Sequence, residues 1–195
     1  MLKRRRMKEL HESRRCPQCW RDGVTNFLAF FVIYTGVYRK AVPFVDDLLR
    51  QSGENTIVDL CSGNGLYVPR FLTSLSKLAP EREVQAVLTD RCPNKNSTLE
   101  IAKLENGNIR YFPEAIDADD ALRKLPGIHV MFSALHHFDE DELTALLQTA
   151  AAAGRPLAFF DYSRRNLPAE LPPLLMVPFL IFLIAPLIRP FSWRQ

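Results

Sequence analysis

The sequence predicts an α/β domain in which a doubly wound, mainly parallel β-sheet carries helices on both faces. The first observation is that five short apolar runs alternate with segments of helical periodicity, the pattern of repeated βαβ units. The second is a glycine-containing turn directly after the first run. The third is size, because 195 residues, 47% of them hydrophobic, suffice for one domain with its own core. The predicted strands span residues 56–59, 84–88, 109–112, 128–132 and 157–160.

Two helices are expected before the first strand. Apolar residues between Val24 and Tyr38 recur at helical spacing, which predicts an amphipathic helix. Pro43 suits the first turn of a second helix, which Gly53 would end. Four further helices are expected between the strands, at about 69–78, 97–105, 118–125 and 140–152. The last of these helices has Asp139 at the N-cap position and Glu142 at the N3 position, the spacing of a capping box.

Positive charge is concentrated at the N-terminus. The first 21 residues hold eight Lys or Arg and two acids, so they carry +6, whereas the whole chain carries +3. The remaining chain therefore carries −3, and no basic surface interleaved with aromatic residues is evident in it. We expect a solvated tail and no nucleic-acid partner.

The cysteines indicate a reducing compartment. Cys16, Cys19, Cys61 and Cys92 show no disulfide framework, and no secretory hydrophobic region follows the basic start. Cys16 and Cys19 form a C-x-x-C with His11 nearby, but a structural zinc site needs four ligands and no second pair is present. The sequence therefore predicts a cytoplasmic protein without a metal site.

The turn after the first strand has the features of a ligand-binding corner. Ile57 and Val58 run into an acid, and Gly63 and Gly65 follow, so the backbone can adopt positive φ and approach a bound molecule. A dinucleotide site would place glycines at positions one, three and six of the turn, where Cys61, Gly63 and Leu66 stand. Only one matches, which disfavours NAD.

With Asp59 included, this corner resembles the first motif of the class I S-adenosylmethionine-dependent methyltransferases: an acid, a hydrophobic residue, then G-x-G-x-G. Cys61 stands where the first glycine would be. The string Ser-Ala-Leu-His-His-Phe at 133–138 resembles the segment after strand four in members that act on small molecules. The segment Trp20-Arg21-Asp22, with Thr25 and Phe27-Leu28, resembles the leader of some bacterial members. The resemblance covers residues 57 to 162 and implies a Rossmann-like fold. An unrelated strand-to-helix turn remains the alternative for the first motif alone.

The resemblance implies a role for each matching residue. Gly63 and Gly65 would contact the methionine portion of S-adenosylmethionine, and Asp59 would hold its ammonium group. Asp90, 25 residues beyond Gly65, stands close to the interval at which a βαβ unit places an acid on a ribose. Alternatively, Asp90 only opens a turn. Candidate cofactor-binding residues are Asp59, Cys61, Gly63, Gly65, Asp90, Ile116, Asp117 and Ser133.

Three further assignments carry explicit alternatives. Asp117 would face the adenine amino group, with Ile116 beside the ring, or it simply caps the following helix. His136 and His137 are the candidate catalytic residues, as general bases, or they have a packing role. Tyr34 and Tyr38 would line the substrate side of an N-terminal helical cap, or they pack in the core.

The C-terminal part does not fit the pattern. Residues 171–188 contain no charge but include four prolines, so they suit a cover on the sheet, an interfacial membrane anchor, or a segment left exposed by a shortened chain. Only 33 residues follow Tyr162 without a hairpin signal, so we expect the last edge strands to be absent. The expected units are a basic tail (1–21), a helical cap (22–53), an S-adenosylmethionine-binding core (54–165) and a hydrophobic end (166–195).

The resemblance thus implies a methyltransferase that uses S-adenosyl-L-methionine, releases S-adenosyl-L-homocysteine and methylates a small molecule. The alternative is a non-catalytic or truncated S-adenosylmethionine-binding module, with peripheral membrane contact through residues 171–190.

Overall fold

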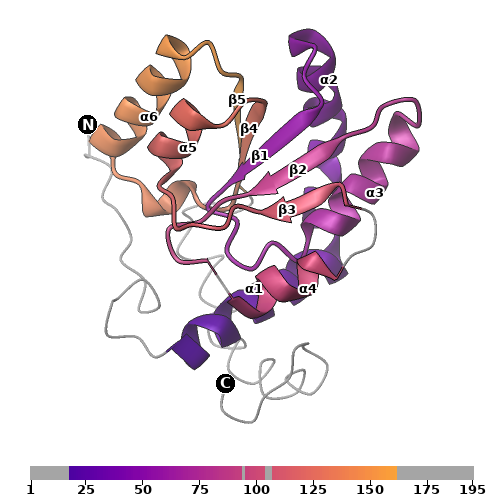
Figure 1. The fold of residues 1–195 in the computed structure, drawn as a ribbon, viewed down its shortest axis with the longest axis vertical. Helices are drawn as coiled ribbons and strands as arrows, with labels where there is room; N and C mark the ends of the chain where they lie inside the picture. The colour runs from indigo at the N-terminus through magenta and orange to yellow at the C-terminus, as the bar shows by residue number, and fades with distance from the viewer. Residues whose placement is uncertain (1–17, 94, 104–106, 162–195) are drawn as a thin grey trace, which may run out of the picture.

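A computed structural model describes residues 18–93, 95–103 and 107–161. Within them one parallel sheet of five strands has the order β3-β2-β1-β4-β5 (Figure 1). Its strands are β1 (Thr56–Leu60), β2 (Gln85–Leu88), β3 (Ile109–Tyr111), β4 (Ile128–Phe132) and β5 (Leu157–Phe160). The predicted α/β class is confirmed, and the strand bounds agree with the predicted ranges to within one residue.

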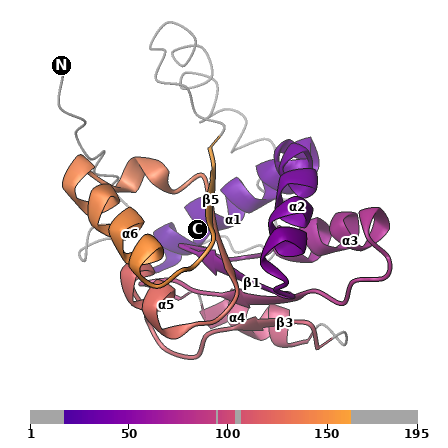
Figure 2. The same ribbon diagram turned by 90° about the horizontal axis from the view of Figure 1, so that it is seen from above.

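Helices cover both faces of this sheet. The helices are α1 (Gln18–Thr35), α2 (Val42–Ser52), α3 (Val68–Leu78), α4 (Lys95–Ala102), α5 (Ala118–Lys124) and α6 (Glu140–Ala152), with short 3₁₀ turns η2 (Val37–Ala41) and η3 (Leu135–His137). One core cluster joins α2, α3 and α4 to the sheet, and a second joins α5 and α6 to it. Viewed from above, α5 and α6 lie on one side of the strands and α2 and α3 on the other (Figure 2). The arrangement is therefore doubly wound, as predicted.

The N-terminal helices differ in their bounds from the prediction. The helix expected from Val24 to Tyr38 begins at Gln18 and ends at Thr35. Gly36 adopts φ 62° and its N–H bonds the Val32 carbonyl, so the helix stops there and a 3₁₀ turn follows. Helix α2 has Pro43 in its first turn and Gly53 at its end, as expected.

Tyr34 and Tyr38 have different environments. Tyr38 is buried in the first core cluster, with its ring 4.6 Å from that of Phe132, which confirms the core alternative for this residue. Tyr34 is 83% exposed on α1. Helix α1 itself is tied to the turn after β1, because Asn64 donates to Asn26 at 3.1 Å.

Helix α6 has the predicted capping box. The Asp139 carboxylate accepts from the Glu142 N–H at 2.9 Å, and the Glu142 carboxylate accepts from the Asp139 N–H at 3.0 Å. This reciprocal pair satisfies two N–H groups at the helix start. It also fixes where the chain turns after η3, which carries the two histidines.

No single helix within the described ranges has both the length and the apolar character needed to cross a membrane. One pair of segments bent by 66°, Asn26–Thr35 with Val37–Ser52, meets the criteria of length and composition together. The apolar stretch 171–188 lies outside the described residues, as do residues 1–17 of the basic start, with Cys16, and the region where further edge strands were considered. Residues 18–21, predicted as part of the tail, belong to helix α1.

Candidate cofactor site

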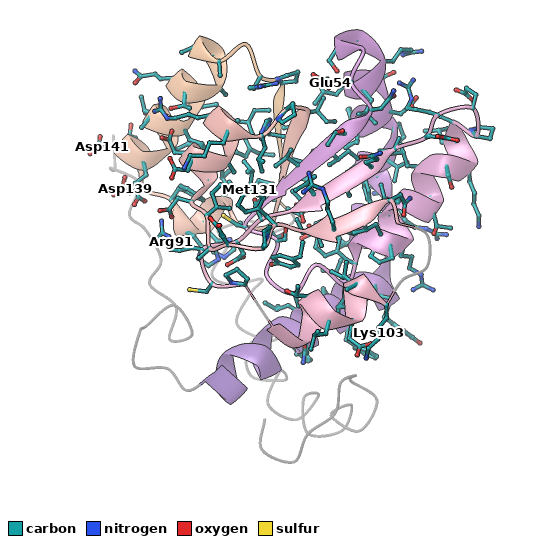
Figure 3. The ribbon with its side chains drawn as sticks, viewed as in Figure 1. Glu54, Arg91, Lys103, Met131, Asp139 and Asp141 are labelled. Carbon is teal, nitrogen blue, oxygen red and sulfur yellow. The ribbon has the colours of Figure 1, made fainter. Side chains whose placement is uncertain are left out.

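The predicted site residues lie where the parallel strands end. Strands β1 and β4 are neighbours in the sheet, but the helices that follow them, α3 and α6, cover opposite faces. The sheet therefore has a topological switch point between these strands, which is where open α/β sheets bind ligands. Figure 3 gives the orientation: Glu54, which precedes β1, lies at the upper end of the sheet, and Arg91, which follows β2, lies toward the lower end.

The turn after β1 has the backbone conformation that its glycines predict. Gly63 and Gly65 adopt φ of 60° and 63°, in the left-handed region. A Cβ on Gly65 would lie 2.4 Å from Leu88 Cδ1 and 3.3 Å from Ile101 Cδ1. Gly65 is thus required so that the turn can pack on β2 and α4, a role that the sequence motif did not reveal.

Asp59 is buried at the end of β1, with 1% of its surface exposed. Its Oδ2 accepts a hydrogen bond from the Tyr67 hydroxyl at 2.7 Å, while its Oδ1 has no hydrogen-bond partner among the described residues. Burial raises the pKa of the Asp59 carboxyl to about 7, and the Tyr67 hydrogen bond opposes that shift. A buried hydrogen-bond acceptor without a partner costs free energy of folding, so we expect Asp59 Oδ1 to accept a hydrogen bond from a bound ligand.

Asp90, after β2, is bonded to the same turn. Its Oδ2 accepts from the Gly63 N–H at 2.8 Å, and its Oδ1 accepts from the Cys92 N–H at 2.7 Å. Burial raises its pKa, and these two N–H groups oppose the rise. Each carboxylate oxygen accepts more than one hydrogen bond. Asp90 is therefore a turn residue, as the alternative held, and it keeps capacity for two hydroxyl donors.

Several residues that the sequence did not single out brace this end of the sheet. The Ser62 and Thr89 hydroxyls both donate to the Asp59 carbonyl, at 2.8 and 2.9 Å. The Tyr111 hydroxyl, from β3, donates to the Gly63 carbonyl at 2.6 Å. Ser62 and Thr89 adjoin motif residues and could have been noticed. Tyr67 and Tyr111 reach the turn only through the tertiary fold.

Asp117 and Ile116 lie on the β3 side of the site. Asp117 occupies the N-cap position of α5, but its side chain makes no capping hydrogen bond and pairs with Arg91 at 2.5 Å instead. Ile116 is 7% exposed in the second core cluster, and its N–H bonds the Asp90 carbonyl at 3.0 Å. The backbone thus joins this segment to Asp90.

Ser133 and the two histidines follow β4. The Ser133 hydroxyl oxygen is buried without a hydrogen-bond partner among the described residues, and the Ser133 N–H bonds the Phe160 carbonyl at 2.8 Å. The His136 and His137 rings lie 4.1 Å apart between centroids. His136 Nδ1 is 3.7 Å from Asp161 Oδ2, while the charge of His137 lowers the pKa of Asp90. His136 therefore lies beside the carboxylate that follows β5, and the charge of His137 acts on the carboxylate that follows β2.

Within the described ranges, only Cys61 and Ser133 are non-glycine residues with positive φ, at 57° and 47°. They follow β1 and β4, the two strands on either side of the switch point. A non-glycine residue in this region costs about 1–2 kcal/mol. Such strain concentrates at functional sites. Burial also raises the pKa of the Cys61 thiol, which favours its neutral form.

No protein-family model matches this sequence. No curated protein matches it either. Among solved structures, the fold is similar to an O-methyltransferase family protein from Burkholderia thailandensis, with 17% identity and a TM-score of 0.47 over 66% of this chain and 37% of that one. It is also similar to human N-acetylserotonin methyltransferase in complex with SAM, with 15% identity and a TM-score of 0.45 over 70% of this chain and 35% of that one. A third similar structure is a candidate methyltransferase from Thermobifida fusca YX, with 16% identity and a TM-score of 0.43 over 70% of this chain and 50% of that one. The chain thus spans between about a third and a half of the length of these proteins.

Proposed function

We propose that this chain binds S-adenosylmethionine at the carboxyl ends of β1, β2 and β4 and transfers its methyl group to a small molecule. The observation that carries the proposal is the Asp59 Oδ1 atom, which is buried without a hydrogen-bond partner among the described residues beside the Gly63–Gly65 turn. An ammonium group is the natural complement of a buried carboxylate oxygen in this state.

The residues present fit the remaining parts of the cofactor. Asp90 retains acceptor capacity for the two ribose hydroxyls, as its two backbone donors each occupy one oxygen. Asp117 and Ile116 lie on the side proposed for adenine, where Asp117 would exchange its pairing with Arg91 for the adenine amino group. When bound, S-adenosylmethionine supplies a methyl carbon activated by an adjacent sulfonium. The protein's contribution is to hold donor and acceptor in line and to exclude water.

The histidines are the candidate bases if the acceptor has a proton to lose. His136 lies near the Asp161 carboxylate, an arrangement that favours the protonated imidazole after proton transfer. The charge of His137 acts on Asp90, the carboxylate proposed for the ribose. We therefore propose that His136 is the stronger candidate for the base.

Replacing Asp90 by Ala is expected to weaken S-adenosylmethionine binding by about ten- to a hundredfold, because each hydrogen bond to a charged acceptor contributes about 1.5–3 kcal/mol. Isothermal titration calorimetry measures the effect. Asp90→Asn serves as a second variant: its single amide oxygen can accept from the Gly63 or the Cys92 N–H but its NH2 group can accept from neither, so it reports the loss of one anchoring bond together with the loss of charge. Asp120→Ala, on the exposed face of α5, is the control. If the affinity of Asp90→Ala is unchanged, Asp90 does not bind the ribose and serves only to hold the turn.

The base assignment predicts a selective loss of turnover. With a methyl acceptor identified by screening small molecules for methylated products, His136→Ala is expected to lower kcat by about a hundredfold or more, because general base catalysis contributes factors of this size. His137→Ala is expected to lower it less, and neither variant should change affinity for S-adenosylhomocysteine greatly. Full rate in both variants would mean that catalysis depends on positioning alone. A chain that binds S-adenosylhomocysteine yet methylates nothing would be the non-catalytic module.

A further inference from the structure

Tyr67 holds one oxygen of the Asp59 carboxylate in a fixed position. Its hydroxyl donates to Asp59 Oδ2 at 2.7 Å. Its ring is confined by those of Tyr38 and Phe132, each 5.4 Å away between centroids, so the hydroxyl has little freedom to turn elsewhere. No part of the sequence motif requires a tyrosine here.

The two oxygens of Asp59 therefore differ. Oδ2 is engaged by Tyr67, whereas Oδ1 is buried without a hydrogen-bond partner in the described part of the chain. The Ser62 and Thr89 hydroxyls bond the backbone carbonyl of Asp59, so they fix its main chain. Because the Tyr67 hydrogen bond fixes Oδ2, the orientation of Asp59 Oδ1 is fixed as well.

We propose that Tyr67 is a positioning residue: by engaging Oδ2 it aims Oδ1 of Asp59 at the α-ammonium group of the bound amino acid moiety. This inference rests on the proposed function, since it concerns the amine of S-adenosylmethionine or S-adenosylhomocysteine. Because the Asp59 side chain is almost fully buried, the amine reaches it only after local movement of the turn or of the helices beside it.

Burial of Asp59, more than the charges near it, is the reason that amine binding is expected to release a proton. The titratable groups that act on it are Tyr67 from the start of α3, Asp90 after β2, Cys61 in the turn and Tyr111 on β3. None supplies a positive charge, and burial raises the pKa of the Asp59 carboxyl to about 7. Near pH 6 the free protein thus holds the neutral acid, and binding an ammonium group ionises it and sends its proton to solvent.

The test compares two ligands that differ in the amino acid moiety. S-adenosylhomocysteine carries the amine, and 5′-methylthioadenosine lacks it. Calorimetric titrations in buffers of different ionisation enthalpy give both affinity and protons released. The wild-type protein is expected to release close to one proton with S-adenosylhomocysteine near pH 6 and few near pH 8, and none with 5′-methylthioadenosine. Tyr67→Phe, which keeps the ring, is expected to weaken S-adenosylhomocysteine about tenfold and to leave 5′-methylthioadenosine unchanged.

Each outcome is decisive. In Tyr67→Phe the proton release should persist to higher pH, because the hydrogen bond that favours the Asp59 anion is gone. Equal weakening of both ligands would show a merely structural tyrosine and would overturn this inference while leaving the proposed function intact. If neither ligand binds the wild-type protein, the proposed function fails and this inference fails with it. Should Tyr67→Phe not fold, Asp59→Asn replaces it: proton release that survives in Asp59→Asn would also overturn the inference.

Discussion

Asp59→Asn is expected to make the ligand-free protein more stable at about pH 8, by about 1–3 kcal/mol, while weakening S-adenosylmethionine binding about ten- to a hundredfold. The two effects have one cause. The carboxylate is buried away from water, and among the described residues the Tyr67 hydroxyl is the donor to its side-chain oxygens. Above its pKa, the buried Asp59 carboxylate carries a charge that lowers the free energy of unfolding.

The sign of the stability effect follows from the direction of the pKa shift. The folded protein holds the Asp59 proton up to pH about 7, whereas a carboxyl in the unfolded chain loses it at the ordinary value of 3.8. Between these values the folded state binds more protons, so the stability contribution of Asp59 decreases as pH rises and is lost above the folded pKa. Asn cannot ionise, and it still offers an oxygen to the Tyr67 hydroxyl.

Chemical denaturation of both proteins at several pH values measures this effect. The difference in unfolding free energy between Asp59→Asn and wild type should grow from about pH 4 to about pH 7 and then level off. Taking the difference removes the opposing contribution of His129, whose pKa burial lowers to about 4. Asp120→Asn, exposed on α5, is the matched control and should show no such trend. A difference that is constant with pH would mean that Asp59 is not buried as an acid.

Gly65→Ala is expected to destabilise the fold by about 3 kcal/mol. The left-handed conformation costs a residue with a side chain about 1–2 kcal/mol. Overpacking a core adds about 1–3 kcal/mol. The added Cβ would lie 2.4 Å from Leu88 Cδ1, and Leu88 is fully buried between neighbouring strands, so it cannot move aside without disturbing β2.

Gly154→Ala is the matched control for this prediction. Gly154 has φ 60°, close to the 63° of Gly65, but no atom lies within 4 Å of its added Cβ. It therefore measures the backbone cost alone, about 1–2 kcal/mol. The two variants are compared by thermal or denaturant unfolding. Equal losses would show that the turn can move away from Leu88, and that Gly65 is required only for its backbone conformation.

Strand positions were predictable because short apolar runs bounded by turn residues are local properties of the chain. The runs at 128–132 and 157–160 match β4 and β5 residue for residue. Helix α1 shows the limit of this reasoning. Its apolar spacing indicated a helix through Tyr38, but Gly36 in the left-handed conformation ends it earlier. The glycine was visible in the sequence, although its conformation depends on how the next turn packs.

Partners of the site residues were much less predictable. Asp117 was expected to face adenine or to cap α5, and in the structure it pairs with Arg91. Gly65 was expected to approach a ligand, and it packs closely on Leu88. Tyr67 and Tyr111 were not singled out at all, yet both bond residues of the first motif. Each of these contacts joins segments that become neighbours only when the sheet is complete.

The sequence by itself determined where strands alternate with helices and which acids and glycines lie at strand termini, because these depend on periodicity and on the conformational freedom of single residues. The tertiary structure alone decided which oxygen of Asp59 is engaged and which is left without a partner. That distinction depends on Tyr67 before α3, Phe132 on β4 and Asp59 on β1 lying next to one another. These residues become neighbours only when the sheet and its helices have packed, so no local pattern in the sequence reveals the contact.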